Sequence, residues 1–536
     1  MRSRSTLSAG VIFLVLLLAA TLGAAAPAVA APASAAPLVA PPADLSGSAD
    51  ALALLAVQQA QLTASDGAAS DQFGYSVAIS GDTAVVGAYQ HAVGGKANQG
   101  AAYVFTRSGT TWSQQAELTA SDGAASDSFG YAVAIDGNTA VVGAPWDNVG
   151  ATIGQGSAYV FTRSGIIWSE QQKLTASDGA TTDYFGWSVS VSGETAMVGA
   201  PYDDVGAYVN QGSAYVYARS GTTWSEQQKL TASDGSSGRA FGCSVAIAGD
   251  TAVAGAYHDI VGANADQGSA YVFVRSGTTW SEQQKLTAAD GHSGDLFGCS
   301  VALSGDTAVV GAYYNDVGAN VHQGSAYVFT RSGTTWSQQA NLTDVYGAAG
   351  DFFGRSVAVS GDTAVVGAYM DDVGANTDQG SACVFARDGT TWSAQSQLTA
   401  ADGAAGDYFG YSVAVSDSTA VVGAYMDTVG ANGQQGSAYV FTGVMDAPGK
   451  PLAKSPKGLI ASRTPTFRWT AAAGAATYEV RVYKGSKLIK TKTGITKTSW
   501  KCTKRLPRGV RLTWKVRARN AAGTGPWSNR PWFKVR

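Results

Sequence analysis

The stretch Phe185–Pro201 reads FGWSVSVSGETAMVGAP, and it decides the fold because the chain contains seven versions of it. In the same copy, a polar loop leads to QGSAYVY (Gln211–Tyr217) and then to TWSEQQKL (Thr223–Leu230). These runs are rich in Val, Tyr, Trp and Thr and are separated by Gly, Asp and Ser, which is typical of short strands joined by turns. Each copy is therefore predicted to form an antiparallel meander of four strands.

A Phe-Gly pair marks each copy, and the copies follow one another at a constant interval of 56 residues. The pairs begin at Phe73, Phe129, Phe185, Phe241, Phe297, Phe353 and Phe409. No window of the repeat has helical periodicity. A fixed period of this length indicates either a linear solenoid or a β-propeller.

The two ends of the repeat array favour the propeller. The seventh copy ends near Thr442, before its fourth strand, while Val57–Gly67 reads VQQAQLTASDG and matches SQQAELTASDG at Ser113–Gly123. In a ring, this N-terminal strand completes the last blade and removes two open sheet edges, whereas a solenoid needs distinct capping repeats. The chain is thus predicted to be all-β, with a seven-bladed propeller over residues 57–444.

The N-terminus resembles a secretory signal peptide. Two arginines precede the apolar run Val11–Leu22, and small residues follow it. This run is shorter than the ~20 residues that a membrane-spanning helix needs. Residues 1–30 are therefore predicted to be a signal peptide and residues 31–56 a linker rich in Ala and Pro, with cleavage after either Ala30 or Ala35. The mature protein is expected to be secreted and to have no membrane span.

Charge divides the chain into two opposite parts, although the net charge is only -3. The segment from Lys450 to Arg536 contains 22 of the 36 Lys and Arg residues, but Glu479 is its only acid. The repeat region is correspondingly acidic. Such a division predicts a separate basic domain at the C-terminus.

The basic tail resembles a fibronectin type III domain over residues 459–536, after a linker at 445–458. Thr466–Trp469 reads as an early strand with a Trp, Thr477–Val482 alternates like a half-buried strand, and Gly525–Ser528 reads Gly-Pro-Trp-Ser. The resemblance implies a β-sandwich that binds or spaces and does not catalyse.

The repeat itself resembles the FG-GAP family, which is known from integrin α-subunit heads and from bacterial exported proteins. Phe129-Gly130 leads to the Gly-Ala-Pro sequence at Gly143–Pro145, and the third copy does the same. In the other five copies Tyr replaces this Pro. The similarity is to the bacterial version and implies a propeller with an extracellular binding role.

The family resemblance would also imply calcium, bound by an Asp-x-Asp-x-Asp-Gly loop before the Gly-Ala-Pro strand. At that place this chain has only the tight hairpins Ser80–Thr83, Asp136–Thr139 and their equivalents. A two-residue turn cannot present the six to eight oxygens that calcium requires. No cofactor is therefore expected, and calcium is not predicted at these hairpins.

Aspartates cluster in two other places of the repeat. Pairs in Asp-Gly-x-x-x-Asp segments ahead of Phe-Gly are the candidates for cation binding: Asp66, Asp71, Asp122, Asp127, Asp178, Asp183, Asp290, Asp295, Asp402 and Asp407. The loop after the second strand holds the candidates for ligand binding: Asp147, Asp203, Asp204, Asp259, Asp316, Asp371, Asp372 and Asp427. Turn formation by Asp and Gly is the favoured interpretation, and cation binding by some loops is the alternative.

One face of the predicted propeller has the longer loops. The connections between strands one and two and between three and four are minimal turns, whereas the loop after strand two has about ten residues. This loop and the Asp-Gly-x-x-x-Asp segment open on the same face. That face is the predicted binding surface.

Two residue types recur in nearly every copy and are interpreted as architectural. The glutamine before the third strand is predicted to satisfy backbone groups: Gln99, Gln155, Gln211, Gln267, Gln323, Gln379 and Gln435. The tryptophan of the fourth strand is predicted to pack between blades or to cover an outer edge: Trp112, Trp168, Trp224, Trp280, Trp336 and Trp392.

The cysteines do not suggest a disulfide framework, because they are not present in every copy. Cys243 and Cys299 occupy equivalent positions where other copies have Tyr, Trp or Arg, Cys383 replaces a repeated Tyr, and Cys502 lies in the tail. They are interpreted as small buried substitutes. A bridge between Cys243 and Cys299 is the alternative.

The sequence contains no recognisable catalytic constellation. His91, His258, His292 and His322 are scattered over different copies, and there is no nucleophile elbow or phosphate-binding loop. Paired carboxylates recur in nearly every copy, which favours a fold element over a single acid and base. The chain is predicted not to be an enzyme, and a propeller lyase or glycosidase acting on extracellular polysaccharide is the alternative.

The predicted function is that of an exported binding or adhesion protein. Its loop face is expected to bind an extracellular protein or glycan. The basic tail is expected to tether it to anionic cell-wall polymers, or else to dock on the acidic propeller. Nucleic acid is not an expected partner, because no recognition motif is present.

Overall fold

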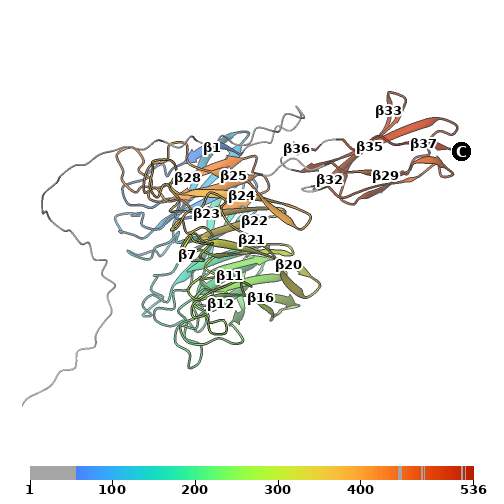
Figure 1. Cartoon of the computed structure of the whole chain (residues 1–536). Helices are drawn as coiled ribbons and strands as arrows, with labels where there is room; N and C mark the ends of the chain where they lie inside the picture. Colours follow the sequence, from blue (N-terminus) through green and yellow to red (C-terminus); the bar gives the residue numbers. More distant parts are fainter. Residues whose placement is uncertain (1–55, 445–449, 473–474, 476, 521–522, 526) are drawn as a thin grey trace, which may run out of the picture. The chain divides into compact units, whose positions relative to one another are not determined.

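The computed structural model describes residues 56–444, 450–472, 475, 477–520, 523–525 and 527–536. The predicted signal peptide and nearly all of the linker after it lie outside these ranges. Within them, every regular element is a β-strand, as predicted for an all-β chain (Figure 1). No helix in the described ranges is long and apolar enough to cross a membrane.

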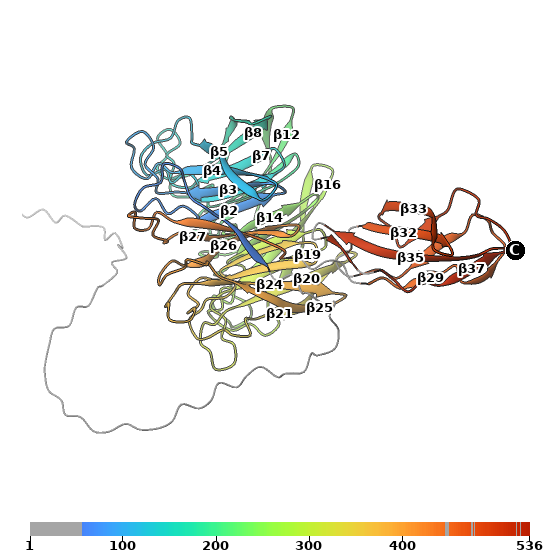
Figure 2. The same ribbon diagram turned by 90° about the horizontal axis from the view of Figure 1, so that it is seen from above.

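Each copy of the repeat forms one four-stranded antiparallel sheet whose strands follow chain order. The first sheet consists of β2 (Ser76–Ser80), β3 (Thr83–Ala88), β4 (Ala101–Ser108) and β5 (Thr111–Leu118). Figure 2 shows these four strands side by side. The predicted meander of four strands is therefore confirmed.

The next five sheets repeat this order. Their strands are β6 (Ala132–Asp136), β7 (Thr139–Ala144), β8 (Ser157–Ser164), β9 (Ile167–Leu174), β10 (Ser188–Ser192), β11 (Thr195–Ala200), β12 (Ser213–Ser220), β13 (Thr223–Leu230), β14 (Val245–Ala248), β15 (Thr251–Ala256), β16 (Ser269–Ser276), β17 (Thr279–Leu286), β18 (Val301–Ser304), β19 (Thr307–Ala312), β20 (Ser325–Ser332), β21 (Thr335–Leu342), β22 (Ser356–Ser360), β23 (Thr363–Ala368), β24 (Ser381–Asp388) and β25 (Thr391–Leu398).

The seventh sheet combines strands from the two ends of the repeat array. It contains β26 (Phe409–Ser416), β27 (Thr419–Ala424), β28 (Ser437–Thr442) and β1 (Val57–Leu62). β1 pairs antiparallel with β28, which lies beside it in Figure 1. The N-terminal segment thus supplies the strand that the seventh copy lacks, as its sequence predicts.

Neighbouring sheets are joined by a hydrogen bond that recurs around the array. Ser76 Oγ donates to the carbonyl oxygen of Gly130 in the next sheet at 2.8 Å. The same serine-to-glycine bond, also 2.8 Å long, occurs at five further junctions: Ser188–Gly242, Ser244–Gly298, Ser300–Gly354, Ser356–Gly410 and Ser412–Gly74. The last of these bonds joins the seventh sheet to the first.

The hydrophobic core lies between successive sheets. The second strand of each sheet, exemplified by β11, is buried at all six positions. In one such interface, Val141 and Val160 from the second sheet pack with Phe185, Ala196 and Tyr215 from the third. The Phe of each Phe-Gly pair is completely buried, which explains why the repeat keeps it.

The recurring Gln and Trp residues have the architectural roles predicted for them. Gln155 Nε2 donates to the backbone oxygen of Ala176 at 3.3 Å. Trp224 is buried and its Nε1 donates to Gln171 Oε1 of the preceding sheet at 2.8 Å. Trp224 therefore packs between two sheets.

The C-terminal segment forms two further sheets. One contains β29 (Ala453–Ser455), β31 (Thr466–Trp469) and β34 (Ser499–Lys501). The other has the order β30-β37-β35-β32-β33, with β36 beside β35. Its bounds are β30 (Gly458–Ile460), β32 (Thr477–Lys484), β33 (Lys487–Ile495), β35 (Arg511–Asn520), β36 (Gly523–Thr524) and β37 (Trp532–Val535).

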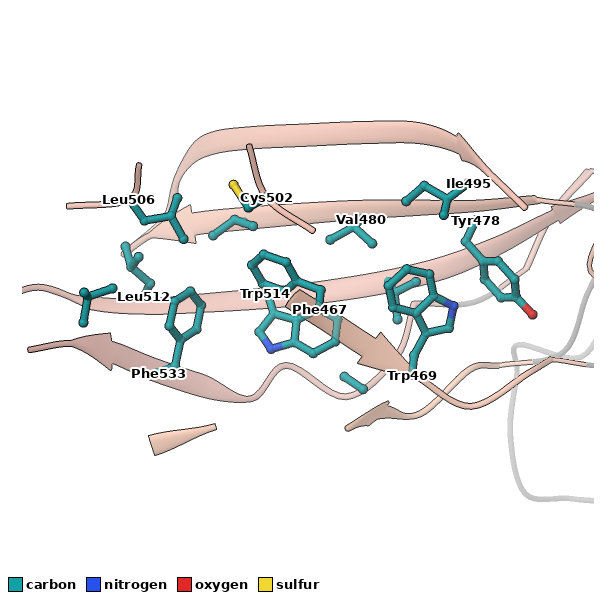
Figure 3. Close-up of a cluster of buried hydrophobic side chains, with 14 of the residues drawn as sticks. Phe467, Trp469, Tyr478, Val480, Ile495, Cys502, Leu506, Leu512, Trp514 and Phe533 are labelled. Carbon is teal, nitrogen blue, oxygen red and sulfur yellow. The ribbon is translucent and has the colours of Figure 1, made fainter. Parts of the chain in front are cut away.

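These two sheets share one hydrophobic core. Phe467 and Trp469 of β31 pack with Val480 of β32, Trp514 of β35 and Phe533 of β37 (Figure 3). Trp514 is completely buried, and its Nε1 donates to the backbone oxygen of Pro456 at 3.0 Å. The aromatic residues that suggested strands in the tail are therefore its core.

The only acid of the tail is used inside the domain. Glu479 is buried, and its carboxylate lies 2.6 Å from Arg481, 2.9 Å from Arg517 and 2.7 Å from Arg519. Most of the other basic side chains described in this segment are exposed. The segment therefore presents a surface of almost uniformly positive charge.

The junction between the seventh and first sheets gives a direct test of the packing. Gly74 has a φ of +91°, and a Cβ there would overlap with the backbone oxygen of Ser437. Gly74→Ala is therefore expected to lower the free energy of unfolding by at least about 3 kcal/mol. Gly81→Ala is the control, because Gly81 has a φ of +58° but open space around it, so it should cost about 1–2 kcal/mol. Equal losses in chemical denaturation would contradict the close approach of these sheets.

Candidate functional site

The aspartates predicted in the loop after the second strand are mostly buried against their own sheet. Asp147 Oδ2 accepts a hydrogen bond from Tyr159 Oη at 3.2 Å, and Lys173 Nζ lies 2.6 Å from it. Asp203 and Asp259 have the same tyrosine and lysine partners in their sheets. These carboxylates already have partners within the fold, and ligand binding by them stays a prediction.

The other aspartates of this set divide between buried and exposed positions. Asp371 and Asp427 are buried and accept hydrogen bonds from Gln397 at 2.8 Å and from Gln61 at 3.3 Å. Three exposed members each accept the backbone N–H of the residue six positions later, at 2.7 to 2.9 Å. They are Asp204, Asp316 and Asp372. Their bonds hold the loop in shape.

The second aspartate of the Asp-Gly-x-x-x-Asp segments is buried and closes a turn, and so does Asp351, in the copy that has Tyr346 as the first residue. Its Oδ2 accepts the backbone N–H of the residue three positions earlier at 2.5 to 2.6 Å in six copies. These residues are Asp71, Asp127, Asp183, Asp295, Asp351 and Asp407. This geometry agrees with the turn-forming interpretation.

The first aspartate of the same segment meets the other set through a lysine. Asp122 lies 2.7 Å from Lys173 Nζ, which also contacts Asp147 at 2.6 Å. Burial opposes the ionisation of Asp122, but hydrogen bonds from Lys173 and Tyr159 outweigh it and lower its pKa. Equivalent lysines connect Asp178 with Asp203 and Asp234 with Asp259, while Asp290 accepts from Asn341 and Asp402 is exposed. In these three sheets the aspartates thus meet in pairs within one sheet, and not around a common site.

Seven other residues do share a site. Each of them is the second residue after the Phe of a Phe-Gly pair. They are of four residue types, and all of them line one cavity of about 340 Å³ beside the seven inner strands. They are Tyr75, Tyr131, Trp187, Cys243, Cys299, Arg355 and Tyr411. Six of them precede the first strand of their sheet and Tyr411 lies near the start of β26, so all seven lie at the end of the strand where the predicted binding loops are.

Four of these residues form a continuous arc of aromatic rings. The ring centroids of Tyr411 and Tyr75 are 5.1 Å apart, those of Tyr75 and Tyr131 are 5.0 Å apart, and those of Tyr131 and Trp187 are 4.9 Å apart. Further rings adjoin the arc, including Tyr89 at 4.4 Å from Tyr75. Such an arc offers broad apolar faces with hydroxyl groups at their edges.

The arc ends at a single cation. Arg355 Nη2 donates to Tyr411 Oη at 2.9 Å, and its guanidinium carbon lies 4.6 Å from the centroid of the Tyr411 ring. Tyr411 Oη in turn donates to Tyr75 Oη at 3.3 Å. No carboxylate among the described residues forms an ion pair with Arg355, and the residues lining the cavity include none. The guanidinium therefore has an uncompensated positive charge.

Between Trp187 and Arg355 the cavity is lined by two small side chains. Cys243 and Cys299 are both free thiols in this structure, so the alternative of a bridge is not realised in it. Burial raises the pKa of Cys243 to about 12 and keeps the thiol neutral. Tyr257 and Tyr313 also line the cavity, and the Tyr313 ring lies 5.9 Å from the guanidinium carbon of Arg355.

The cavity therefore combines three features that suit a carbohydrate acid. Aromatic faces stack on the apolar faces of sugar rings, phenol hydroxyls exchange hydrogen bonds with sugar hydroxyls, and a guanidinium pairs with a carboxylate. Burial raises the pKa of Tyr369, beside Tyr411, to about 12, so its phenol remains a neutral donor. One sequence signal pointed to this site: the seven positions hold four residue types, whereas the Phe-Gly pair just before them is the same in every copy.

The buried aspartates lead to a prediction about pH. Burial raises the pKa of Asp183, Asp351 and Asp407 to about 6. Between about pH 4 and pH 6 the folded chain therefore holds more protons than the unfolded chain, and stability decreases as pH rises through this window. The melting temperature at pH 5 is expected to exceed that at pH 7.5.

Asp407→Asn keeps the acceptor for the N–H of Ala404 but removes the titrating group, so it should reduce this difference. Asp417→Asn, at an exposed turn, is the control and should leave it unchanged. A melting temperature that rises from pH 5 to pH 7.5 in the parent chain would contradict the prediction.

Comparison with known proteins identifies the repeat. The family model described as FG-GAP repeat matches seven segments, each running from the fourth strand of one sheet to the third strand of the next. The segments are residues 56–105, 112–161, 168–217, 224–273, 280–329, 336–385 and 392–441. No curated protein matches the chain. Because the seven matches together cover more than half of the sequence, the chain belongs to the FG-GAP repeat family.

Proposed function

We propose that this FG-GAP chain is an exported binding protein whose seven sheets are the blades of a closed β-propeller, and that the cavity at its loop face binds a carbohydrate with a carboxylate group. The observation that carries the proposal is the pairing of an aromatic arc with the unpaired guanidinium of Arg355. The wider assignment to extracellular binding rests on the family.

The propeller arrangement is supported by the contacts around the array. Each sheet contacts the next, and the bond from Ser412 Oγ to Gly74 O joins the seventh sheet to the first. β1 occupies the outer edge of the seventh sheet and pairs with β28. A ring of this kind leaves short, protected edges, as in other propellers.

The ligand class follows from the mixed chemistry of the lining. An apolar ligand would leave the charge of Arg355 unpaired in a partly buried site, which costs free energy. A neutral sugar would use the aromatic faces but not the cation. A sugar carboxylate satisfies both, because a guanidinium binds a carboxylate through two parallel hydrogen bonds.

The residues that line the cavity support binding of the carbohydrate without its hydrolysis. A glycosidase needs two carboxylates on opposite sides of the scissile bond. The described lining residues provide hydroxyls, thiols, aromatic rings and one guanidinium, and none of them is a carboxylate or a histidine. The cavity is therefore proposed as a recognition site.

The tail is proposed to be a fibronectin type III-like sandwich that tethers the protein to anionic polymers. Exposed cations such as Lys492, Lys497 and Lys501 support this role. The single acid, Glu479, is buried beneath three partly exposed arginines. Attraction of this kind has a strong salt dependence.

The cavity proposal is tested with trigalacturonate as an acidic probe and a neutral galactose trisaccharide as its counterpart. Calorimetry on the chain from residue 31 is expected to show that trigalacturonate binds and the neutral trisaccharide does not, or that trigalacturonate binds at least tenfold more tightly. Arg355→Gln should weaken acid binding by at least about tenfold, the equivalent of one charge-assisted hydrogen bond. Trp187→Ala should weaken both sugars.

Arg331→Gln is the matched control, because Arg331 pairs with Asp306 at 2.6 Å outside the cavity. It should leave the affinity unchanged. Unaltered binding by Arg355→Gln would refute the assignment of the cation. Shortened sugar products would refute the proposal of binding without turnover.

The tail proposal is tested by retention of the same chain on immobilised polyglycerol phosphate. Binding at 50 mM salt is expected to be lost at 1 M salt, where the screening length falls to about 3 Å. A triple variant, Lys492→Glu, Lys497→Glu and Lys501→Glu, should also lose it. The control adds acids elsewhere, at exposed hairpins of the repeat region: Thr110→Glu, Thr222→Glu and Thr278→Glu. Equal loss in both triple variants would show that only net charge matters.

A further inference from the structure

A group of side chains in the first sheet has the composition of a metal site. His91 follows β3, Glu117 lies on β5, and Asp66 and Asp71 lie in the segment between β1 and β2. His91 Nε2 lies 3.7 Å from Asp66 Oδ2 and 4.0 Å from Glu117 Oε1, and His91 Nδ1 lies 2.9 Å from Asp71 Oδ2. The histidine is buried, so its ring is held in this orientation.

The equivalent groups in other sheets show what is special here. In the second sheet Lys173 Nζ lies 2.7 Å from Asp122 and 2.6 Å from Asp147 and supplies the positive charge between them. The third and fourth sheets have the same arrangement. In the first sheet Glu117 replaces the lysine and His91 replaces the second aspartate. Two carboxylates therefore face an imidazole where a lysine ammonium would otherwise hold them together.

An independent observation comes from the tyrosine of β4. In the second sheet Tyr159 Oη donates to Asp122 at 2.8 Å. The equivalent Tyr103 Oη is fully buried but has no hydrogen-bond partner among the described residues. The ring centroids of Tyr103 and His91 lie 6.0 Å apart, so this tyrosine borders the same group of side chains. An unpartnered buried hydroxyl is costly, and a water molecule bound to an ion between the carboxylates would satisfy it.

The orientation of His91 is that of a metal ligand. Its Nδ1 bonds to Asp71, which fixes the ring, and its Nε2 points toward Asp66 and Glu117. In metal sites, a carboxylate on the far ring nitrogen sets the tautomer and leaves the other nitrogen free to coordinate. An Nε2 lone pair facing two carboxylates is unfavourable, and either a proton or a metal cation on Nε2 relieves the repulsion.

We propose that His91, Asp66 and Glu117 bind a divalent transition-metal ion of the zinc class, with Asp71 as the positioning residue of His91. One imidazole and two carboxylates are ligands that zinc accepts, whereas calcium prefers six to eight oxygens. Ligand atoms around zinc lie within about 3.3–3.6 Å of one another at bond lengths of about 2.0–2.2 Å. Side-chain shifts of less than about 1 Å from the observed separations suffice.

The position of the site gives the ion a structural role. Asp66 and Asp71 belong to the segment that continues from β1, the strand that completes the seventh sheet. His91 and Glu117 belong to the first sheet. A bound ion would fasten this segment to the first sheet, so binding should stabilise the folded chain, and the stabilisation should grow with the logarithm of the free metal concentration once that exceeds the Kd.

The experiment uses the chain from residue 31, treated with chelator and then dialysed. Calorimetry with zinc chloride is expected to show one bound ion per chain with micromolar or tighter affinity. Calcium chloride should bind at least tenfold more weakly. The melting temperature should rise with zinc and return to its starting value after a chelator is added.

Two variants separate a metal site from a simple network of charges. Glu117→Lys restores the lysine of the sister sheets, so it should fold and lose the zinc response. His91→Asn should lose it as well, whereas His258→Asn and His322→Asn, outside the cluster, should keep it. The fifth sheet serves as a comparison within the same chain. It has Asn315 in place of His91 and Asn341 in place of Glu117.

Three results would overturn the proposal. The first is no zinc binding by the chelated parent chain. The second is undiminished zinc binding and stabilisation in Glu117→Lys, which would leave these residues as a charge network only. The third is calcium binding equal to or tighter than zinc binding, which would exclude the zinc class.

Discussion

The whole repeat region depends on how closely the backbones of adjacent sheets approach one another. The glycine of the second strand, such as Gly87, lies so near the carbonyl oxygen of Gly130 in the next sheet that a Cβ would overlap with it. That contact brings Ser76 within hydrogen-bonding distance of the same oxygen. Because each junction obeys the same constraint, the Phe-Gly and Gly-Ala sequences recur, and the core between sheets is filled in nearly the same way seven times.

Much of this arrangement could be predicted from the sequence. The constant 56-residue interval gave the number of sheets, and the match between Val57–Gly67 and Ser113–Gly123 gave the partner of the N-terminal strand. A repeated sequence repeats its physical constraints, so one copy is a guide to all others. The two-sheet core of the tail was less evident, because it depends on residues such as Trp469 and Phe533 that meet only through tertiary packing.

The candidate site was harder to predict, because a residue type that is abundant in the loops is not necessarily free to bind a ligand. Aspartates in the loops attract attention, yet Asp147 and Asp407 have their oxygens occupied by partners within the fold. The residues that line the cavity resemble core positions in the sequence, and Arg355 stands out only when all seven copies are compared at one column. Which columns converge in space depends on how the seven sheets pack together and not on any single copy.

The pairing of β1 with β28 also has a mechanical consequence. The chain leaves the repeat region just after Thr442, at the end of β28, and this strand is hydrogen-bonded to β27 on one side and to β1 on the other. A pulling force transmitted through the tail would therefore act on β28, which is hydrogen-bonded along both of its sides. The force would not act on an edge strand that is hydrogen-bonded on one side only. If a protein is anchored at one end and attached to its ligand at the other, pairing of the N-terminal strand with β28 would raise the force needed to unfold the seventh sheet.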